Sequence, residues 1–153
     1  NKSIMETKVN EIAISYSGSI KTKLLPKISS SRDAANLLFE HWDKQNIELF
    51  ESFKMLLLNN SNKVKGIYTL SKGGITGTLV DIRIVFAVVL KSVTTSIILA
   101  HNHPSGTLQP SQPDKLLTEK IKKAGELFDI KVLDHLILTP DGDYFSFADE
   151  GIL

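Results

Sequence analysis

The chain has 153 residues, the usual size of one globular domain, and 42% of them are hydrophobic, enough for a buried core. Lys and Arg (18) nearly balance Asp and Glu (17), so the net charge of +1 gives no argument for nucleic-acid binding. Cysteine is absent, which excludes disulfides, thiolate metal ligands and a cysteine nucleophile. No apolar run reaches membrane-spanning length and no signal peptide is visible, so we expect a soluble, cytoplasmic protein.

The first part of the chain, residues 1–28, is interpreted as an N-terminal extension that precedes one domain over 29–153. Residues 9–16 alternate loosely between apolar and polar side chains, a pattern that indicates an edge strand. Three serines at 29–31 then precede a run with apolar residues three and four apart. This pattern predicts a helix over 32–42 with a serine at its N-cap.

The rest of the chain alternates between strand and helix patterns. An asparagine-rich stretch at 59–62 indicates a hairpin turn, and the glycine pair that ends 71–74 indicates a turn or a bulge. The predicted strands are 54–58, 64–70, 96–100, 130–139 and 144–147, and the further helices are 81–92 and 114–128. This order predicts an α/β (mixed α+β) fold, a single layered domain with a mixed β-sheet flanked by helices.

Two histidines follow the apolar strand 96–100. Residues i and i+2 of an extended chain point to the same side, so His101 and His103 can direct both imidazoles at one point. Asn102 points away from them, and we expect it to bond the loop backbone. Neutral imidazoles are good zinc ligands, and a catalytic zinc site has three protein ligands with a position left for water. Asp114 could supply the third ligand as a carboxylate oxygen.

The serine and the aspartate of this stretch also have a purely structural interpretation. Ser111-x-x-Asp114 has the spacing of a capping box, and Pro113 suits the first turn of a helix. Ser111 would then be an ordinary N-cap, and the two histidines could be neighbours by chance. The joint occurrence of all four residues favours a metal site.

Taken together, His101-x-His103, seven residues, Ser111, two residues and Asp114 resemble the JAMM (MPN-plus) metalloenzyme signature. The string His-Asn-His-Pro-Ser-Gly, followed by Pro-Ser-x-x-Asp, is similar to the RadC-like (JAB-domain) branch of that family. The resemblance extends from about Ser29 to Leu153 and implies a cytidine-deaminase-like JAMM architecture. It also includes Gly77-Thr78, Arg83, Asp134-His135-Leu136 and Ser146-Phe147-Ala148-x-x-Gly151.

The resemblance implies a role for each matching residue. His101, His103 and Asp114 match the zinc ligands, and Ser111 matches the residue that helps to stabilise the oxyanion. The family also needs an upstream glutamate as general acid/base at the start of a strand. Glu51 matches that position in a Glu-x-Phe pattern, and Glu48 is the alternative.

Asp134 and His135 form a polar pair inside a predicted strand. One of them could be the hydrogen-bond partner of a zinc-binding histidine. Because adjacent strand residues face opposite sides, at most one can take this role. The alternative is a hydrogen-bonded polar pair at the margin of the sheet.

The sequence therefore leaves three functions to compare. The first is a zinc-dependent metallopeptidase or isopeptidase that acts on a peptide or protein substrate. The second is a nucleic-acid-associated protein, because RadC-like proteins are habitually labelled as DNA repair proteins, although the balanced charge offers little support. The third is a metal-binding scaffold without catalysis. Exposed strand edges make a homodimer plausible, and no membrane partner is expected.

Overall fold

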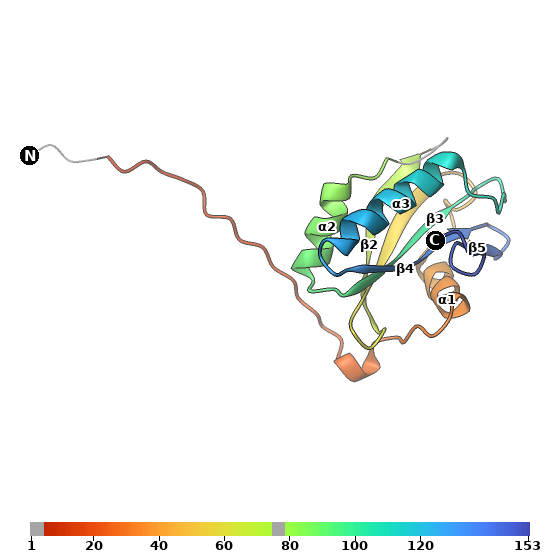
Figure 1. Ribbon diagram of the computed structural model, residues 1–153, viewed down its shortest axis with the longest axis horizontal. Helices are drawn as coiled ribbons and strands as arrows, with labels where there is room; N and C mark the ends of the chain where they lie inside the picture. The colour runs from red at the N-terminus through yellow and green to blue at the C-terminus, as the bar shows by residue number, and fades with distance from the viewer. Residues whose placement is uncertain (1–4, 75–78) are drawn as a thin grey trace, which may run out of the picture.

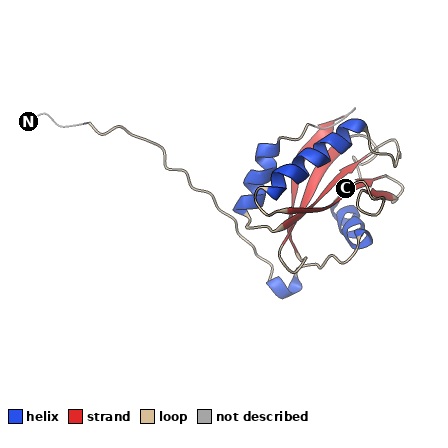
Figure 2. Ribbon diagram, viewed as in Figure 1, coloured by secondary structure: helices blue, strands red, loops and turns tan. Residues whose placement is uncertain are grey.

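Apolar strand patterns gather into one five-stranded sheet in the computed structural model, which describes residues 5–74 and 79–153 (Figures 1 and 2). The strands are β1 (Glu51–Leu58), β2 (Val64–Gly74), β3 (Ser96–Asn102), β4 (Lys131–Leu138) and β5 (Tyr144–Ser146). Their order is β2-β1-β3-β4-β5. β3 and β4 are parallel and the other neighbours antiparallel, so the predicted mixed sheet is confirmed.

Within the part of the chain that the structure describes, three α-helices and a short 3-10 helix complete the fold. They are η1 (Thr22–Leu24), α1 (Ser31–His41), α2 (Ile82–Lys91) and α3 (Gln112–Glu126). The serine cap predicted for the first helix is Ser30, whose hydroxyl accepts a hydrogen bond from the Asp33 N–H at 3.2 Å. His41, at the end of this helix, is exposed.

The helices cover the two faces of the sheet and make two cores (Figure 1). α1 packs on one face, where Leu38 joins residues such as Ile98 and Leu136. α2 and α3 pack on the opposite face, where Val85 and Ile121 join the residues of β1 and β3 that point that way. The result is the layered arrangement that the sequence predicts.

β3 lies in the middle of the sheet, and all seven of its residues are buried. The strand is two residues longer than predicted, because its ladder continues until His101 pairs with Phe53 and Asn102 pairs with Leu138. α3 connects β3 to the parallel strand β4. Such a crossover brings the chain back past the sheet, so the N-terminal end of α3 comes next to the end of β3.

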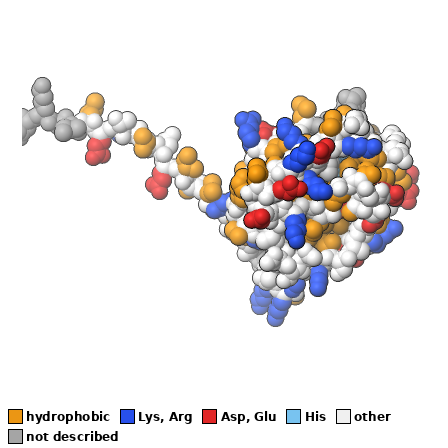
Figure 3. Space-filling view, in the orientation of Figure 1, with side chains coloured by type: hydrophobic (Ala, Val, Ile, Leu, Met, Phe, Trp, Pro, Cys, Tyr) orange, Lys and Arg blue, Asp and Glu red, His pale blue; other side chains and the backbone are white. Residues whose placement is uncertain are grey.

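The edge strand predicted over 9–16 is wrong. These residues have no regular secondary structure and leave the domain as an extended arm (Figure 3). Val9 and Ile12 of the arm are 86% and 87% exposed, and within the described residues no part of 9–16 pairs with another strand. A strand needs a paired neighbour as well as an alternating pattern, and only the pattern is present here.

The predicted strand over 64–70 is too short, since β2 continues through Gly74. Glu51 pairs with Gly74 and Ser52 pairs with Lys72, so Gly73 is an extra residue in the ladder. Its φ of 90° suits glycine, and the bulge offered as the alternative to a turn is therefore present. Gly77 and Thr78 lie outside the described residues. Within the described ranges, no helix is long and apolar enough to cross a membrane.

Candidate metal centre

Three side-chain donor atoms converge where β3 ends and α3 begins. The Nε2 atoms of His101 and His103 lie 3.0 Å apart. The Oδ2 atom of Asp114 lies 3.3 Å from the first and 3.5 Å from the second. His101 is buried, and the other two residues are partly exposed. The structure thus brings together the three residues that the resemblance matches to zinc ligands.

The spacing of these atoms can be compared with that of a metal coordination sphere. Tetrahedral ligands with bonds of about 2.0–2.1 Å lie about 3.3 Å from one another. The three observed separations are close to that value, and this group could hold a metal ion. Because three donors fill three corners of a tetrahedron, a fourth position remains for water or substrate.

His103 extends one residue beyond the end of β3 and is held by its own loop. Its Nδ1 atom lies 2.7 Å from the carbonyl oxygen of Thr107. The loop folds back because Gly106 has a φ of 85° and donates its N–H to the carbonyl of His103 at 3.0 Å. A carbonyl only accepts, so Nδ1 carries a proton, and in the neutral ring Nε2 keeps its lone pair for the centre.

Behind His101, a chain of buried polar atoms leads back to α3. The Nδ1 atom of His101 lies 2.7 Å from Nε2 of His135, and Nδ1 of His135 lies 2.5 Å from the Thr118 hydroxyl. That hydroxyl donates to the backbone carbonyl of Asp114 at 2.7 Å. Thr118 was not predicted from the sequence, where its one signal is its position one helical turn after Asp114.

Of the Asp134-His135 pair, His135 faces the centre. It is buried between Phe53 and Phe147, and its ring stacks on Phe147 with centroids 4.5 Å apart. Burial holds the pKa of His135 well below its ordinary value, so the ring is neutral. Asp134 instead accepts hydrogen bonds from Ser146 Oγ and the Ala148 N–H.

The capping box expected from Ser111-x-x-Asp114 is present. The Ser111 hydroxyl accepts from the Asp114 N–H at 3.1 Å, and Asp114 Oδ2 accepts from the Ser111 N–H at 2.8 Å. The oxygen that completes the box is also the one that faces the two imidazoles. The structural interpretation and the metal-site interpretation are therefore compatible.

Hydrogen bonds at the centre shift the pKa values of Asp114 and His103. Burial alone would raise the pKa of Asp114, but hydrogen bonds with His101 and His103 outweigh it and hold that pKa well below its ordinary value. Burial alone would lower the pKa of His103, yet the hydrogen bonds to Asp114 and to the Thr107 carbonyl raise it. The carboxylate is thus ionised, as a metal ligand must be.

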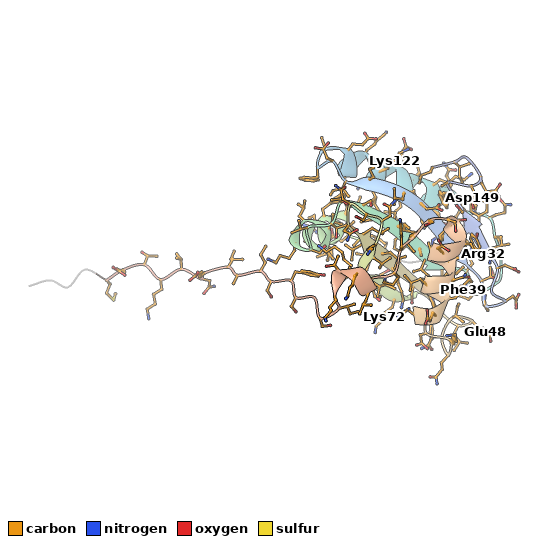
Figure 4. The ribbon with its side chains drawn as sticks, turned by 90° about the horizontal axis from the view of Figure 1, so that it is seen from below. Arg32, Phe39, Glu48, Lys72, Lys122 and Asp149 are labelled. Carbon is orange, nitrogen blue, oxygen red and sulfur yellow. The ribbon has the colours of Figure 1, made fainter. Side chains whose placement is uncertain are left out.

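Glu51 is the first residue of β1 and is half-buried. Phe53, two residues later, pairs with His101 and its ring stacks on that imidazole with centroids 5.7 Å apart. Side chains two residues apart share a sheet face, so Glu51 lies on the face that carries the histidines. Its carboxylate acts on His103 by charge and raises the pKa of that imidazole. Glu48 is exposed at the edge of the domain (Figure 4).

Comparison with known proteins agrees with these motifs. The model of one family, described as the RadC-like JAB domain, matches residues 28–152. A UPF0758 protein from Flavobacterium johnsoniae is 55% identical over 131 residues, which are 84% of this chain and 54% of that protein. A UPF0758 protein from Porphyromonas gingivalis is 47% identical over 103 residues, which are 67% of this chain and 45% of that protein.

A more distant relative extends the similarity to nearly the whole chain. A UPF0758 protein from Clostridioides difficile is 33% identical over 154 residues, covering 95% of this chain and 65% of that protein. The chain spans about half the length of the first two relatives. Since the family model covers residues 28–152, which include every residue of the candidate centre, the chain belongs to the RadC-like JAB-domain family.

Proposed function

We propose that this domain is a zinc-dependent hydrolase that cleaves a peptide or isopeptide bond. The observation that carries the proposal is the convergence of His101 Nε2, His103 Nε2 and Asp114 Oδ2 at separations of 3.0, 3.3 and 3.5 Å. These separations fit tetrahedral coordination of an ion by nitrogen and oxygen ligands. The chain has no cysteine, so the donor set is the one typical of hydrolytic rather than structural zinc sites.

Both imidazoles are oriented for a metal. Ligation through Nε2 leaves a proton on each Nδ1, and each of these N–H groups has an acceptor nearby. His135 Nε2 accepts from His101, and the Thr107 carbonyl accepts from His103. Partners of this kind fix the ring orientation of a ligand histidine. Bound there, zinc would supply Lewis acidity toward a substrate carbonyl and would lower the pKa of water.

The protein's own side chains transfer the proton and stabilise the oxyanion. The Glu51 carboxylate takes a proton from the attacking water and later delivers it to the amine nitrogen that leaves. The water oxygen ends in the new carboxyl group, so one water and one amide give one acid and one amine. The Ser111 hydroxyl accepts from the Asp114 N–H, which leaves its own proton to stabilise the developing oxyanion.

The first test measures metal and activity together. Protein purified without added metal is analysed for zinc before and after zinc addition, in parallel with His103→Ala. Labelled peptide and isopeptide substrates are then offered with and without chelator. We expect one zinc per chain in the wild type, a large loss in the variant, and chelator-sensitive cleavage. A wild type that binds no zinc after addition would overturn the proposal.

A second comparison separates a hydrolase from a metal-binding scaffold. Glu51→Gln should keep zinc but lower the cleavage rate by about 10²–10⁴-fold, the usual contribution of a general acid/base. Glu48→Gln is the matched control, since Glu48 is exposed, and it should keep both zinc and activity. Equal activity of Glu51→Gln and the wild type would remove Glu51 from the mechanism.

A further inference from the structure

Asn102 lies between the two candidate metal ligands in the sequence, but its side chain points to the other face of the sheet. Ile98 and Ala100 lie four and two residues before Asn102, so they share its face of β3, and both belong to the core under α1. The side chain is fully buried, at 0% exposure. A buried amide must satisfy its two donor hydrogens and its acceptor within the protein.

All of these hydrogen bonds go to one backbone segment. The Asn102 side-chain oxygen accepts from the Ser52 N–H at 2.7 Å, and its nitrogen donates to the carbonyls of Ile47 and Phe50, each at 2.9 Å. The Phe50 carbonyl belongs to the peptide group before Glu51, and the Ser52 N–H belongs to the peptide group after it. One side chain therefore holds both peptide groups that flank Glu51.

Glu51 itself projects to the other face. It lies two residues before Phe53 in β1 and therefore on the same sheet face as Phe53, whose ring stacks on that of His101 with centroids 5.7 Å apart. The backbone of Glu51 is thus fixed from the α1 side, while its carboxylate is presented on the side of the metal centre. The residue that fixes it is covalently joined to both histidines.

We propose that Asn102 is a positioning residue that sets the place of the Glu51 carboxylate relative to His101 and His103. The inference rests on the proposed function, since it assigns Asn102 to the general acid/base of that site. His101 and Asn102 lie in β3, and His103 follows directly after it. This one strand therefore positions the two histidine ligands and, through the Asn102 amide, the two peptide groups that flank Glu51. The distance between base and metal ligands is then set by one strand rather than by the loop over 42–50.

The first measurement begins with the wild-type protein and does not depend on activity. Hydrogen exchange by NMR on the wild type should show that the Ser52 amide is protected about as strongly as amides in the middle of β1, although Ser52 is the second residue of the strand. In Asn102→Ala this protection should fall at least tenfold, while that of the Leu99 amide stays. A Ser52 amide that exchanges rapidly in the wild type would overturn the inference, whether or not any substrate is cleaved.

The second measurement uses activity and metal content. Asn102→Ala should keep zinc and KM while kcat falls about 100-fold, because a displacement of about 1 Å can cost that much. In a Glu51→Gln background, Asn102→Ala should give no further loss, since it acts through the residue already removed. An equal loss in both backgrounds would mean a general structural role and would overturn the inference.

Asn59 provides a matched control at the opposite end of β1. Its side-chain oxygen also accepts from two backbone N–H groups, those of Ser61 at 2.9 Å and Lys63 at 3.1 Å. Asn59→Ala should keep kcat and the protection of the Ser52 amide. If Asn102→Ala fails to fold, Asn102→Leu, which keeps a similar volume but has no hydrogen-bonding group, replaces it in every arm. A wild type without cleavage would refute the proposed function and leave the exchange arm decisive.

Discussion

The Nδ1 atom of His101 lies 2.7 Å from the Nε2 atom of His135, inside a buried site between Phe53 and Phe147. His135→Leu removes the acceptor and keeps a similar volume. We expect zinc affinity to fall about 10–100-fold, the usual effect of removing such a partner, because the His101 ring loses its fixed orientation. Competition with a chromophoric chelator measures this affinity.

The control for His135→Leu is His41→Leu, because His41 is exposed and bonds only the Leu37 carbonyl of its own helix. It should bind zinc like the wild type. Thr118→Val removes the hydroxyl next to His135 Nδ1 and should weaken zinc binding. Thr118→Ser keeps the hydroxyl and should bind zinc like the wild type. Unchanged zinc affinity in His135→Leu would contradict the role given to this hydrogen bond.

Asp114 and Ser111 can be separated by substitution. Asp114→Asn keeps an oxygen that can accept from the Ser111 N–H but lacks the carboxylate charge. We expect zinc binding to be lost and the free energy of unfolding of the zinc-free protein to fall as well, because hydrogen bonds with His101 and His103 stabilise the ionised carboxylate in the folded state. Chemical denaturation and zinc titration of the same samples check both quantities.

For Ser111→Ala we expect the opposite outcome for zinc binding. It removes the N-cap of α3 and should lower the free energy of unfolding by about 1 kcal/mol, with zinc affinity nearly unchanged and kcat reduced. Ser30→Ala is the matched control, since Ser30 caps α1 in the same way. It should lower stability by a similar amount and leave kcat as it is. Equal kcat values for the two variants would argue against an oxyanion role for Ser111.

Gly125 lies where the end of α3 approaches the start of β4. A Cβ atom there would lie 2.7 Å from the carbonyl oxygen of Ile130, and a backbone atom cannot move aside easily. We expect Gly125→Ala to lower the free energy of unfolding by about 1–2 kcal/mol despite the better helix propensity of alanine. Gly66→Ala, where nothing lies within 4 Å of the added Cβ, is the control and should change stability by less than about 0.5 kcal/mol.

Asp134 should give a pH dependence of stability. Burial raises its pKa in the folded protein despite hydrogen bonds from Ser146 and Ala148. A raised folded pKa contributes stability below the unfolded pKa, and this contribution is lost as pH rises through the folded pKa. Asp134→Asn cannot ionise, so its stability relative to wild type should increase as pH rises through this range. Denaturation of both zinc-free proteins across the acidic range checks the sign, and a constant difference would contradict it.

The sequence predicted the parts of the fold that follow from periodicity. A serine cap before the first helix, the capping box that begins at Ser111, and the order of strands and helices were readable because apolar spacing and capping residues are local signals. The N-terminal arm was misassigned because pairing depends on a neighbour that the sequence does not specify. β2 was cut short at Leu70 because two adjacent glycines look like a turn, although one of them is a bulge within a continuing ladder.

The candidate centre was predictable to a similar extent. His101, His103 and Asp114 were found because their spacing is short and characteristic. Thr118 was not predicted, and Asn102 was expected to bond the backbone of its own loop, whereas its three hydrogen bonds go to the segment 47–52. Such partners depend on how β1, β3 and α3 pack. Sequence patterns identify residue types, whereas hydrogen-bond partners across the sheet require the three-dimensional structure.

The order in which the site assembles follows from where its parts lie in the chain. All three donor atoms come from residues 101–114, so bringing them together closes only a short loop, which costs little conformational entropy. Glu51 reaches the same place only when β1 pairs with β3 across some fifty residues of intervening chain. Under the proposed function, a folding chain captures its metal ion early, whereas substrate hydrolysis begins only after β1 and β3, the central pair of strands, have closed.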